Sequence, residues 1–246
     1  MVYISRLLAI SDGTSRSAGE ISDLTGIPQG ASSGKVVPHL DYMALMGLLC
    51  EDRSTLTELG ERVRMEDPAC SELLTQWLLH ANLTSVQGAD MWNYVYRQLL
   101  PANSRRVSDA FYKSSVEAHF PTAKRYGCLR TFYEKQVPDL EYLSSEKGSL
   151  IINTQPIRRE FIFLYAYDIV REWEALYGDI PEITASQFEA MQCAAVFGIP
   201  DENWFSVLEL LSGKGLFRIN RQLAPYTVIR CTDSRSLISK LYSLLV

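Results

Sequence analysis

Residues 21–49 read ISDLTGIPQGASSGKVVPHLDYMALMGLL, and this stretch decides the fold of the first part of the chain. Its apolar residues recur at helical spacing in two blocks, which are separated by a turn that contains Gly26, Pro28 and Gly30. A glycine at the end of a helix typically takes the left-handed C-cap conformation, so the first helix is predicted to end at Gly26. The stretch therefore predicts a helix, an open turn and a second helix.

The residues on either side complete this module. Ser17 and Glu20 have the spacing of a capping box, in which side chains pair with the first backbone amides of a helix. Beyond Gly47, short apolar segments at 48–49 and 55–57 flank a polar turn, which is typical of a small β-hairpin or wing. The order predicts a winged helix-turn-helix, a module that lays its second helix in a DNA groove or against a partner protein.

The rest of the chain divides into a helical middle and a return to the opening pattern. Apolar and aromatic residues at helical spacing dominate residues 67–180. Residues 184–187 then form a second capping box, and two helices are predicted to end at Gly198 and Gly213, followed by strands. The fold class is thus mainly α, with an N-terminal winged helix-turn-helix (1–66), a helical middle (67–180) and a second winged-helix-like module at the C-terminus (181–246).

Composition restricts the class of protein further. The chain has 246 residues, enough for a large core or for two to three small domains, and its net charge is −5. No apolar run approaches the roughly 18 residues that a membrane span needs, and the N-terminus is a poor signal peptide. We therefore expect a cytoplasmic protein with no membrane partner, whose five scattered cysteines are reduced thiols.

The charge is segregated along the chain. Residues 1–70 and 161–210 are net acidic, whereas residues 97–135 and 211–246 are net basic. A basic surface on an acidic protein can still bind phosphates locally. The alternative, that each basic block is a solvated surface neutralised by acidic neighbours, stays open.

Several short motifs in residues 21–100 resemble one known family. They are Leu56-Thr57 with Leu59-Gly60, the Asp67-Pro68 step, the apolar helix containing Trp77-Leu78-Leu79-His80, and Trp92-Asn93-Tyr94. Together they resemble a bacterial family of unknown function, domain number four thousand and seven. Members of that family tend to lie beside genes resembling phosphoadenosine-phosphosulfate reductases, in DNA-modification and phage-defence clusters. The resemblance implies a role around DNA modification or defence, with other subunits of such a system as partners, and it names no catalytic residue.

A search for chemistry in the sequence finds recognition residues rather than an active site. Residues 30–36 are one residue too short for a phosphate-binding loop, and the histidines and cysteines have no metal-ligand spacing. We therefore expect no catalytic residue, no cofactor and no metal. Polar and basic side chains near the recognition helix and in the basic segments are the candidates for contacts with double-stranded DNA: Gln29, Ser32, Ser33, Lys35, His39, Arg105, Arg106, Lys124, Arg125, Arg130, Arg158, Arg159, Arg218 and Arg221.

Two functions from different classes remain at this point. The first is a DNA-binding accessory protein, in which the second helix of residues 21–49 orients or reads and the downstream arginines supply the attraction. The second is a protein–protein adaptor or scaffold subunit of a defence complex, which uses the same modules to hold other subunits. The sequence leaves the formation of homo-oligomers open.

Overall fold

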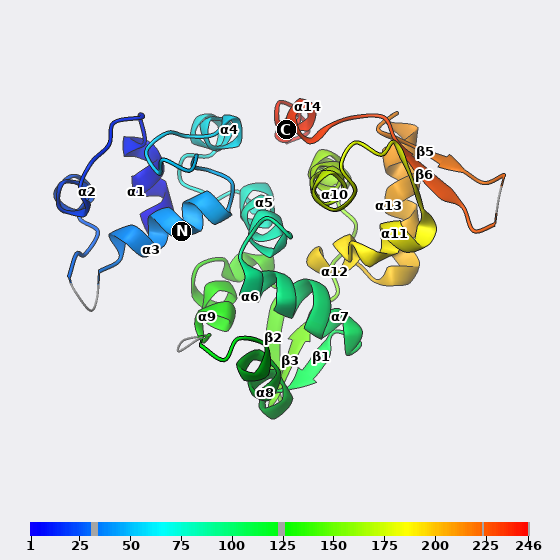
Figure 1. Ribbon diagram of the computed structural model, residues 1–246, viewed down its shortest axis with the longest axis horizontal. Coiled ribbons are helices and arrows are strands. Elements are labelled where there is room, and N and C mark those ends of the chain that lie inside the picture. Colours follow the sequence, from blue (N-terminus) through cyan, green and yellow to red (C-terminus); the bar gives the residue numbers. More distant parts are fainter. Residues whose placement is uncertain (31–33, 123–125, 223, 246) are drawn as a thin grey trace. The chain divides into compact units, whose positions relative to one another are not determined.

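The computed structural model describes residues 1–30, 34–122, 126–222 and 224–245 (Figure 1). The chain is mainly helical, as predicted, and its named strands form two small three-stranded antiparallel sheets. It divides into two compact units, Met1–Leu83 and Thr84–Val246. No helix within the described ranges is long and apolar enough to cross a membrane.

The first unit contains the predicted helix, turn, helix and hairpin in the predicted order. Its helices are α1 (Val2–Ile10), α2 (Ala18–Thr25), α3 (Val36–Leu45), α4 (Glu58–Glu66) and α5, which starts at Leu73 and ends at Thr84. The hairpin lies between α3 and α4 and is reduced to a single antiparallel bridge between Leu49 and Leu56.

Local signals set the ends of α2. The Ser17 hydroxyl accepts from the Glu20 amide and the Glu20 carboxylate accepts from the Ser17 amide, so the predicted capping box is confirmed. Gly26 follows α2 with φ of 67°, which is the left-handed C-cap that its sequence predicted.

The hairpin of the first unit contacts the link between α1 and α2 and also packs against α4. The Cys50 amide donates to Thr55 O at 2.9 Å, and the Gly13 amide, from the link between α1 and α2, donates to Ser54 O at 3.0 Å. At position 60 of α4 only glycine fits, because a Cβ there would lie 2.1 Å from Leu48 O. The backbone of α4 therefore packs directly against the hairpin.

The second unit contains two sheets joined by helices. Its elements in chain order are α6 (Asp90–Asn93), η1 (Tyr94–Leu99, a π-helix), α7 (Leu100–Ala102), β1 (Arg106–Ser108), α8 (Asp109–His119), α9 (Cys128–Lys135), η2 (Pro138–Leu140), β2 (Leu143–Glu146), β3 (Ser149–Ile152), η3 (Arg159–Phe161), α10 (Ile162–Tyr177), β4 (Glu182–Thr184), α11 (Ala185–Ala190), α12 (Cys193–Val196), α13 (Asp201–Gly213), β5 (Phe217–Asn220), β6 (Thr227–Arg230) and α14 (Ser234–Ile238).

The two sheets have the same strand order and equivalent packing. Their orders are β1-β3-β2 and β4-β6-β5, so the second strand of each hairpin is central. In the first sheet, buried Val107 is paired with buried Leu150; in the second, buried Ile183 is paired with buried Val228. Each sheet therefore turns one apolar face toward the helices of its own part of the unit.

The same element order occurs three times along the chain. A leading helix is followed by a link or strand, one or more short helices, a further helix and a hairpin. We name the three segments module 1 (residues 2–57), module 2 (residues 90–152) and module 3 (residues 162–230). In modules 2 and 3 the first strand ends on a residue, Ser108 or Thr184, whose side chain caps the next helix.

The helical middle expected for residues 67–180 is therefore incomplete, because it also contains the β1-β3-β2 sheet. The strands are three or four residues long, and β1 buries only Val107. Alternation over so few residues gives no strand signal in the sequence. The hairpin turn is formed by Lys147 and Gly148, both at positive φ, as in the tight turns that join short strands.

The C-terminal elements lie close to their predicted places. The second capping box, between Thr184 and Gln187, is confirmed, and α13 and the two hairpin strands occupy the expected segments. The helix expected to continue to Phe197 is instead divided into α11 and α12, because Gln192 takes a left-handed conformation with φ of 55°.

Replacement of Thr184 by alanine tests whether its side chain stabilises the N-terminus of α11. Thr184→Ala removes the acceptor for the Gln187 amide, and we expect it to lower the free energy of unfolding by about 1 kcal/mol in urea denaturation. Thr154→Ala, at an exposed position outside any helix or strand, is the matched control. Equal stability of the two variants would contradict a capping role for Thr184.

Candidate nucleic-acid interface and buried ion cluster

The candidate DNA contacts of module 1 present little charge. Lys35 is exposed at the start of α3, but Val37, two residues further on, is 50% exposed and apolar. His39 is half-buried, with Nδ1 2.6 Å from Lys35 O, and burial lowers its pKa, so its imidazole is neutral at physiological pH. Gln29 is exposed, whereas Ser32 and Ser33 lie outside the described residues.

Module 2 brings basic side chains of three elements together. Arg130 of α9 donates to Asp109 Oδ1 of α8 at 3.2 Å and to Ser145 Oγ of β2 at 2.5 Å. The turn of the β2–β3 hairpin reaches the same place, because the Asp109 amide donates to Gly148 O at 2.8 Å. Lys113, one helical turn beyond Asp109, and Lys147 of the hairpin turn are exposed. Arg130 thus pairs with Asp109 and, at 4.0 Å, with Glu134, while the exposed Lys113 and Lys147 belong to the same region of the module.

Two further candidates of this module lie on or beside β1. Arg106 is exposed and forms no ion pair with the described residues, whereas Arg105 forms an ion pair with Asp201 at 2.5 Å. Lys124 and Arg125 precede α9 and lie outside the described residues. The basic sequence of residues 97–135 is thus only partly available to a ligand.

The candidates of module 3 are divided in the same way. Arg159 and Arg218 are exposed and have no ion pair among the described residues. Arg158 lies 3.7 Å from Glu160, and Arg221 of the hairpin donates to Glu209 of α13 at 2.7 Å. Both ion pairs are solvent-exposed, where such pairs are weak and yield easily to another anion.

Carboxylates, rather than cations, line the exposed face of α13. Asp201 and Glu202 occupy its first turn and Glu209 lies two turns further on, all exposed. A recognition helix contacts base edges with residues near its N-terminal end, where phosphates of both strands are close. Acidic side chains at that end repel a phosphate backbone.

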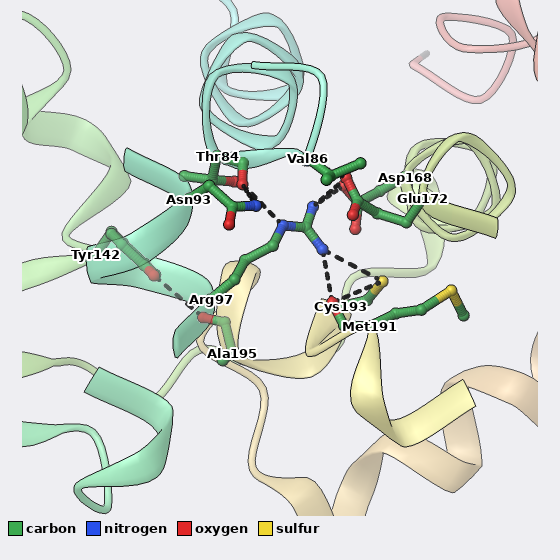
Figure 2. Close-up of polar contacts among 10 residues, drawn as sticks. All are labelled: Thr84, Val86, Asn93, Arg97, Tyr142, Asp168, Glu172, Met191, Cys193 and Ala195. Atoms are coloured by element: carbon green, nitrogen blue, oxygen red, sulfur yellow. Dashed lines mark hydrogen bonds and ion pairs between the residues drawn. The ribbon is translucent and has the colours of Figure 1, made fainter. Parts of the chain in front are cut away.

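Sequence reasoning missed a buried ion cluster around Arg97, which Figure 2 shows. Arg97 comes from the π-helix η1, and its side chain is only 4% exposed. Its Nη2 donates to Asp168 Oδ1 at 2.5 Å and lies 3.6 Å from Glu172 Oε1, both on α10. The remaining nitrogens donate to main-chain carbonyls: Nε to Thr84 O at 3.0 Å and Nη1 to Met191 O at 2.9 Å.

The cluster joins the leading helices of modules 2 and 3. One guanidinium binds η1 to α10, to Thr84 at the start of the second unit and to the link between α11 and α12. Beside it, Tyr142 Oη of module 2 donates to Ala195 O of module 3 at 3.1 Å. A planar donor with several fixed N–H groups is suited to connect segments far apart in sequence.

The charges of the cluster do not balance when both carboxyls are ionised. Asp168 and Glu172 are 2% exposed, and Asp168 Oδ2 has no hydrogen-bond partner. Burial raises the pKa of Glu172, and the Asp168 carboxylate raises it further, against the opposing effect of Arg97. The Val86 amide donates to Glu172 Oε1 at 3.0 Å, a bond that the protonated carboxyl can also accept.

The cluster left one weak signal in the sequence. Asp168 and Glu172 are spaced i, i+4 on the same helical face of α10 as the apolar Tyr165 and Ile169, where charged residues rarely lie unless they are paired. Arg97 lies 71 residues from Asp168, so the pairing itself could not be predicted. With no exposed acid or base, the cluster has no access for a substrate, and its role is to hold the two modules together.

Comparisons with known proteins add no identity to this arrangement. No family model, no curated protein and no solved structure matches the chain. Among the described residues, no group of histidine, cysteine, aspartate or glutamate side chains is arranged to hold a metal ion. The resemblance drawn from residues 21–100 thus stays a prediction.

Replacement of Arg97 tests the role of the cluster. Arg97→Met removes the cation but leaves two buried carboxyls, so we expect a loss of about 3–5 kcal/mol in the free energy of unfolding of the second unit. The control is Arg97→Met combined with Asp168→Leu and Glu172→Leu, which removes the stranded charges and is expected to recover part of that loss. An unchanged stability of the single variant in urea denaturation would contradict the assignment.

Replacement of Glu172 by glutamine tests its protonation. With a raised folded pKa, the carboxyl of the unfolded chain ionises first as pH rises above about 4.5, so wild-type stability falls across the interval up to the folded pKa. Glu172→Gln keeps the acceptor for Val86 and does not ionise, so its stability relative to wild type is expected to improve as pH rises above about 4.5. A deficit that instead grows with pH would mean that the ionised carboxylate is required.

Proposed function

We propose that this chain is an accessory protein that binds duplex DNA through winged-helix modules. The observation that carries the proposal is the repeated order of helix, strand or link, helices and hairpin, with the second hairpin strand central in modules 2 and 3. In helix-turn-helix proteins this arrangement presents the second helix and its neighbouring hairpin to DNA. Module 2 combines that order with a local excess of cations.

The phosphate-binding surface of this proposal is the region of module 2 near Asp109, which contains Lys113, Arg130 and Lys147, and we name it the Asp109 surface. Lys113 and Lys147 are exposed, and Arg130 is positioned by Asp109 and Ser145 rather than buried. The surface lies beside the N-terminus of α8; the Asp109 amide there already donates to Gly148 O, so α8 adds to the attraction for phosphate only through its helix dipole. A surface of this kind tracks the DNA backbone and does not by itself read sequence.

Modules 1 and 3 contribute less to DNA affinity in this account. Module 1 offers Lys35 beside the apolar Val37, and module 3 presents the carboxylates of α13 where phosphates would lie. The attraction therefore comes from module 2, and the net charge of −5 limits binding to that local surface.

A salt series of binding to a fluorescent duplex of about 20 base pairs tests the proposal. The log of the affinity is expected to fall with the log of the salt concentration, with a slope of about −0.9 for each neutralised phosphate. The double variant Lys113→Glu with Lys147→Glu removes two contacts, so its slope is expected to be shallower by about 2.

Lys135→Glu at the far end of α9 is the matched control, because it alters the charge of the same module away from the Asp109 surface. Each single lysine variant should weaken binding more than Lys135→Glu does. Absence of binding at low salt, or a slope independent of salt, would exclude the proposed function. An equal effect of all three single variants would assign the affinity to bulk charge instead.

A second function, that of a protein–protein adaptor, is favoured by one specific observation. The exposed face of α13, which in a DNA-binding module contacts DNA, bears Asp201, Glu202 and Glu209. Module 3 is therefore better suited to a protein than to a nucleic acid. In this alternative the modules hold other subunits of a complex, and DNA binding by module 2 is absent.

A further inference from the structure

The second half of α13 forms one wall of an open groove of about 930 Å³. Ser206, Glu209, Leu210 and Gly213 line that wall and follow one another at helical spacing, so they form a single stripe on the helix. The groove is also lined by residues at and just before the start of α10 and by two residues of the C-terminal segment: Ile157, Arg159, Glu160, Ile162, Lys214 and Leu244. We name this the α13 groove.

Four apolar side chains line the α13 groove, and we call them its floor. They are Ile157, Ile162, Leu210 and Leu244, and the residues at both ends of the α13 stripe are small, which leaves the groove open along the helix. Ile157, Leu210 and Leu244 are neither fully buried nor fully exposed, so each has apolar surface left to cover. Covering such a surface is favourable at about 25 cal/mol for each Å².

The uncompensated charges of the groove are positive. Arg159 and Lys214 are exposed and form no ion pair with the described residues, whereas Glu160 and Glu209 already have Arg158 and Arg221 as partners. Since α10 begins at Ile162, the positive end of its helix dipole also lies at the groove. An apolar floor between free cations fits an occupant that is both apolar and acidic.

We propose that the α13 groove binds a short acidic, amphipathic peptide segment of a partner protein, with apolar side chains on the floor and carboxylates paired with Arg159 and Lys214. Segments of this kind dock through a few apolar anchors spaced along one face. A nucleic acid fits the groove less well, because the floor offers phosphates no hydrogen-bond donors and carboxylates lie on α13. The inference does not depend on DNA binding by module 2.

Selection from a phage-displayed library of random dodecapeptides on the immobilised full chain is the test. Enriched peptides are expected to combine aspartate or glutamate with leucine, isoleucine or aromatic residues. Synthetic, fluorescent copies of these peptides are then measured by anisotropy. Lys214→Glu and Arg159→Glu are each expected to weaken their binding by about tenfold, because an ion pair is replaced by a repulsion.

Gly213→Glu provides a variant that keeps the fold. A Cβ at Gly213 would meet no atom within 4 Å and its φ is not positive, so the larger side chain occupies the groove without disturbing the core. It is expected to abolish peptide binding. Gly127→Glu, at another glycine with open space, and Lys135→Glu are the matched controls and are expected to bind as wild type does.

Several results would overturn the proposal. These are an absence of enriched peptides, enrichment of basic or wholly polar peptides, and unchanged binding of the enriched peptides by Gly213→Glu and Lys214→Glu. If Lys214→Glu and Arg159→Glu weaken duplex DNA binding while they still bind the peptides, the groove is a nucleic-acid surface. Because module 2 variants leave the groove intact, failure of DNA binding in Lys113→Glu has no bearing on this outcome.

Discussion

A single buried guanidinium fixes the arrangement of the second unit. Arg97 is surrounded by Asp168 and Glu172 of one helix and by carbonyl groups from two other segments. Removing such a cation from a dry site leaves charges that no water can reach, so the cluster is costly to break even where its net contribution to stability is small. The interaction therefore specifies which surfaces of modules 2 and 3 are covered and which stay exposed.

That arrangement determines how the charges of the chain are used. Arg105 is drawn to Asp201 at the start of α13, so one candidate DNA contact instead connects the two modules. Of the cations that stay available, Lys113 and Lys147 belong to the Asp109 surface of module 2, and Arg159 and Lys214 line the α13 groove of module 3. We infer a division of labour in which phosphates are bound by one module and a protein segment by the next.

Local signals made much of the fold predictable. Helix ends at Gly26 and the capping boxes at residues 17–20 and 184–187 depend on neighbouring residues alone, and they lie where the sequence predicted them. The β1-β3-β2 sheet could not be predicted, because its pairing joins Val107 to Leu150 through strands of three or four residues. For the candidate DNA contacts, the sequence could indicate which basic residues to consider but not which of them are free. Ion pairs such as Arg221 with Glu209 depend on tertiary structure.

The most direct test of the account measures the distance between modules 2 and 3 by pulsed electron resonance. Spin labels are placed at exposed Ala118 of α8 and Arg218 of β5, after replacement of the three cysteines that are not buried, Cys50, Cys128 and Cys231, by serine. We expect one narrow distance distribution, which becomes broad when Arg97→Met is introduced. A broad distribution with Arg97 intact, or a narrow one that survives its replacement, would contradict the central role of the cluster.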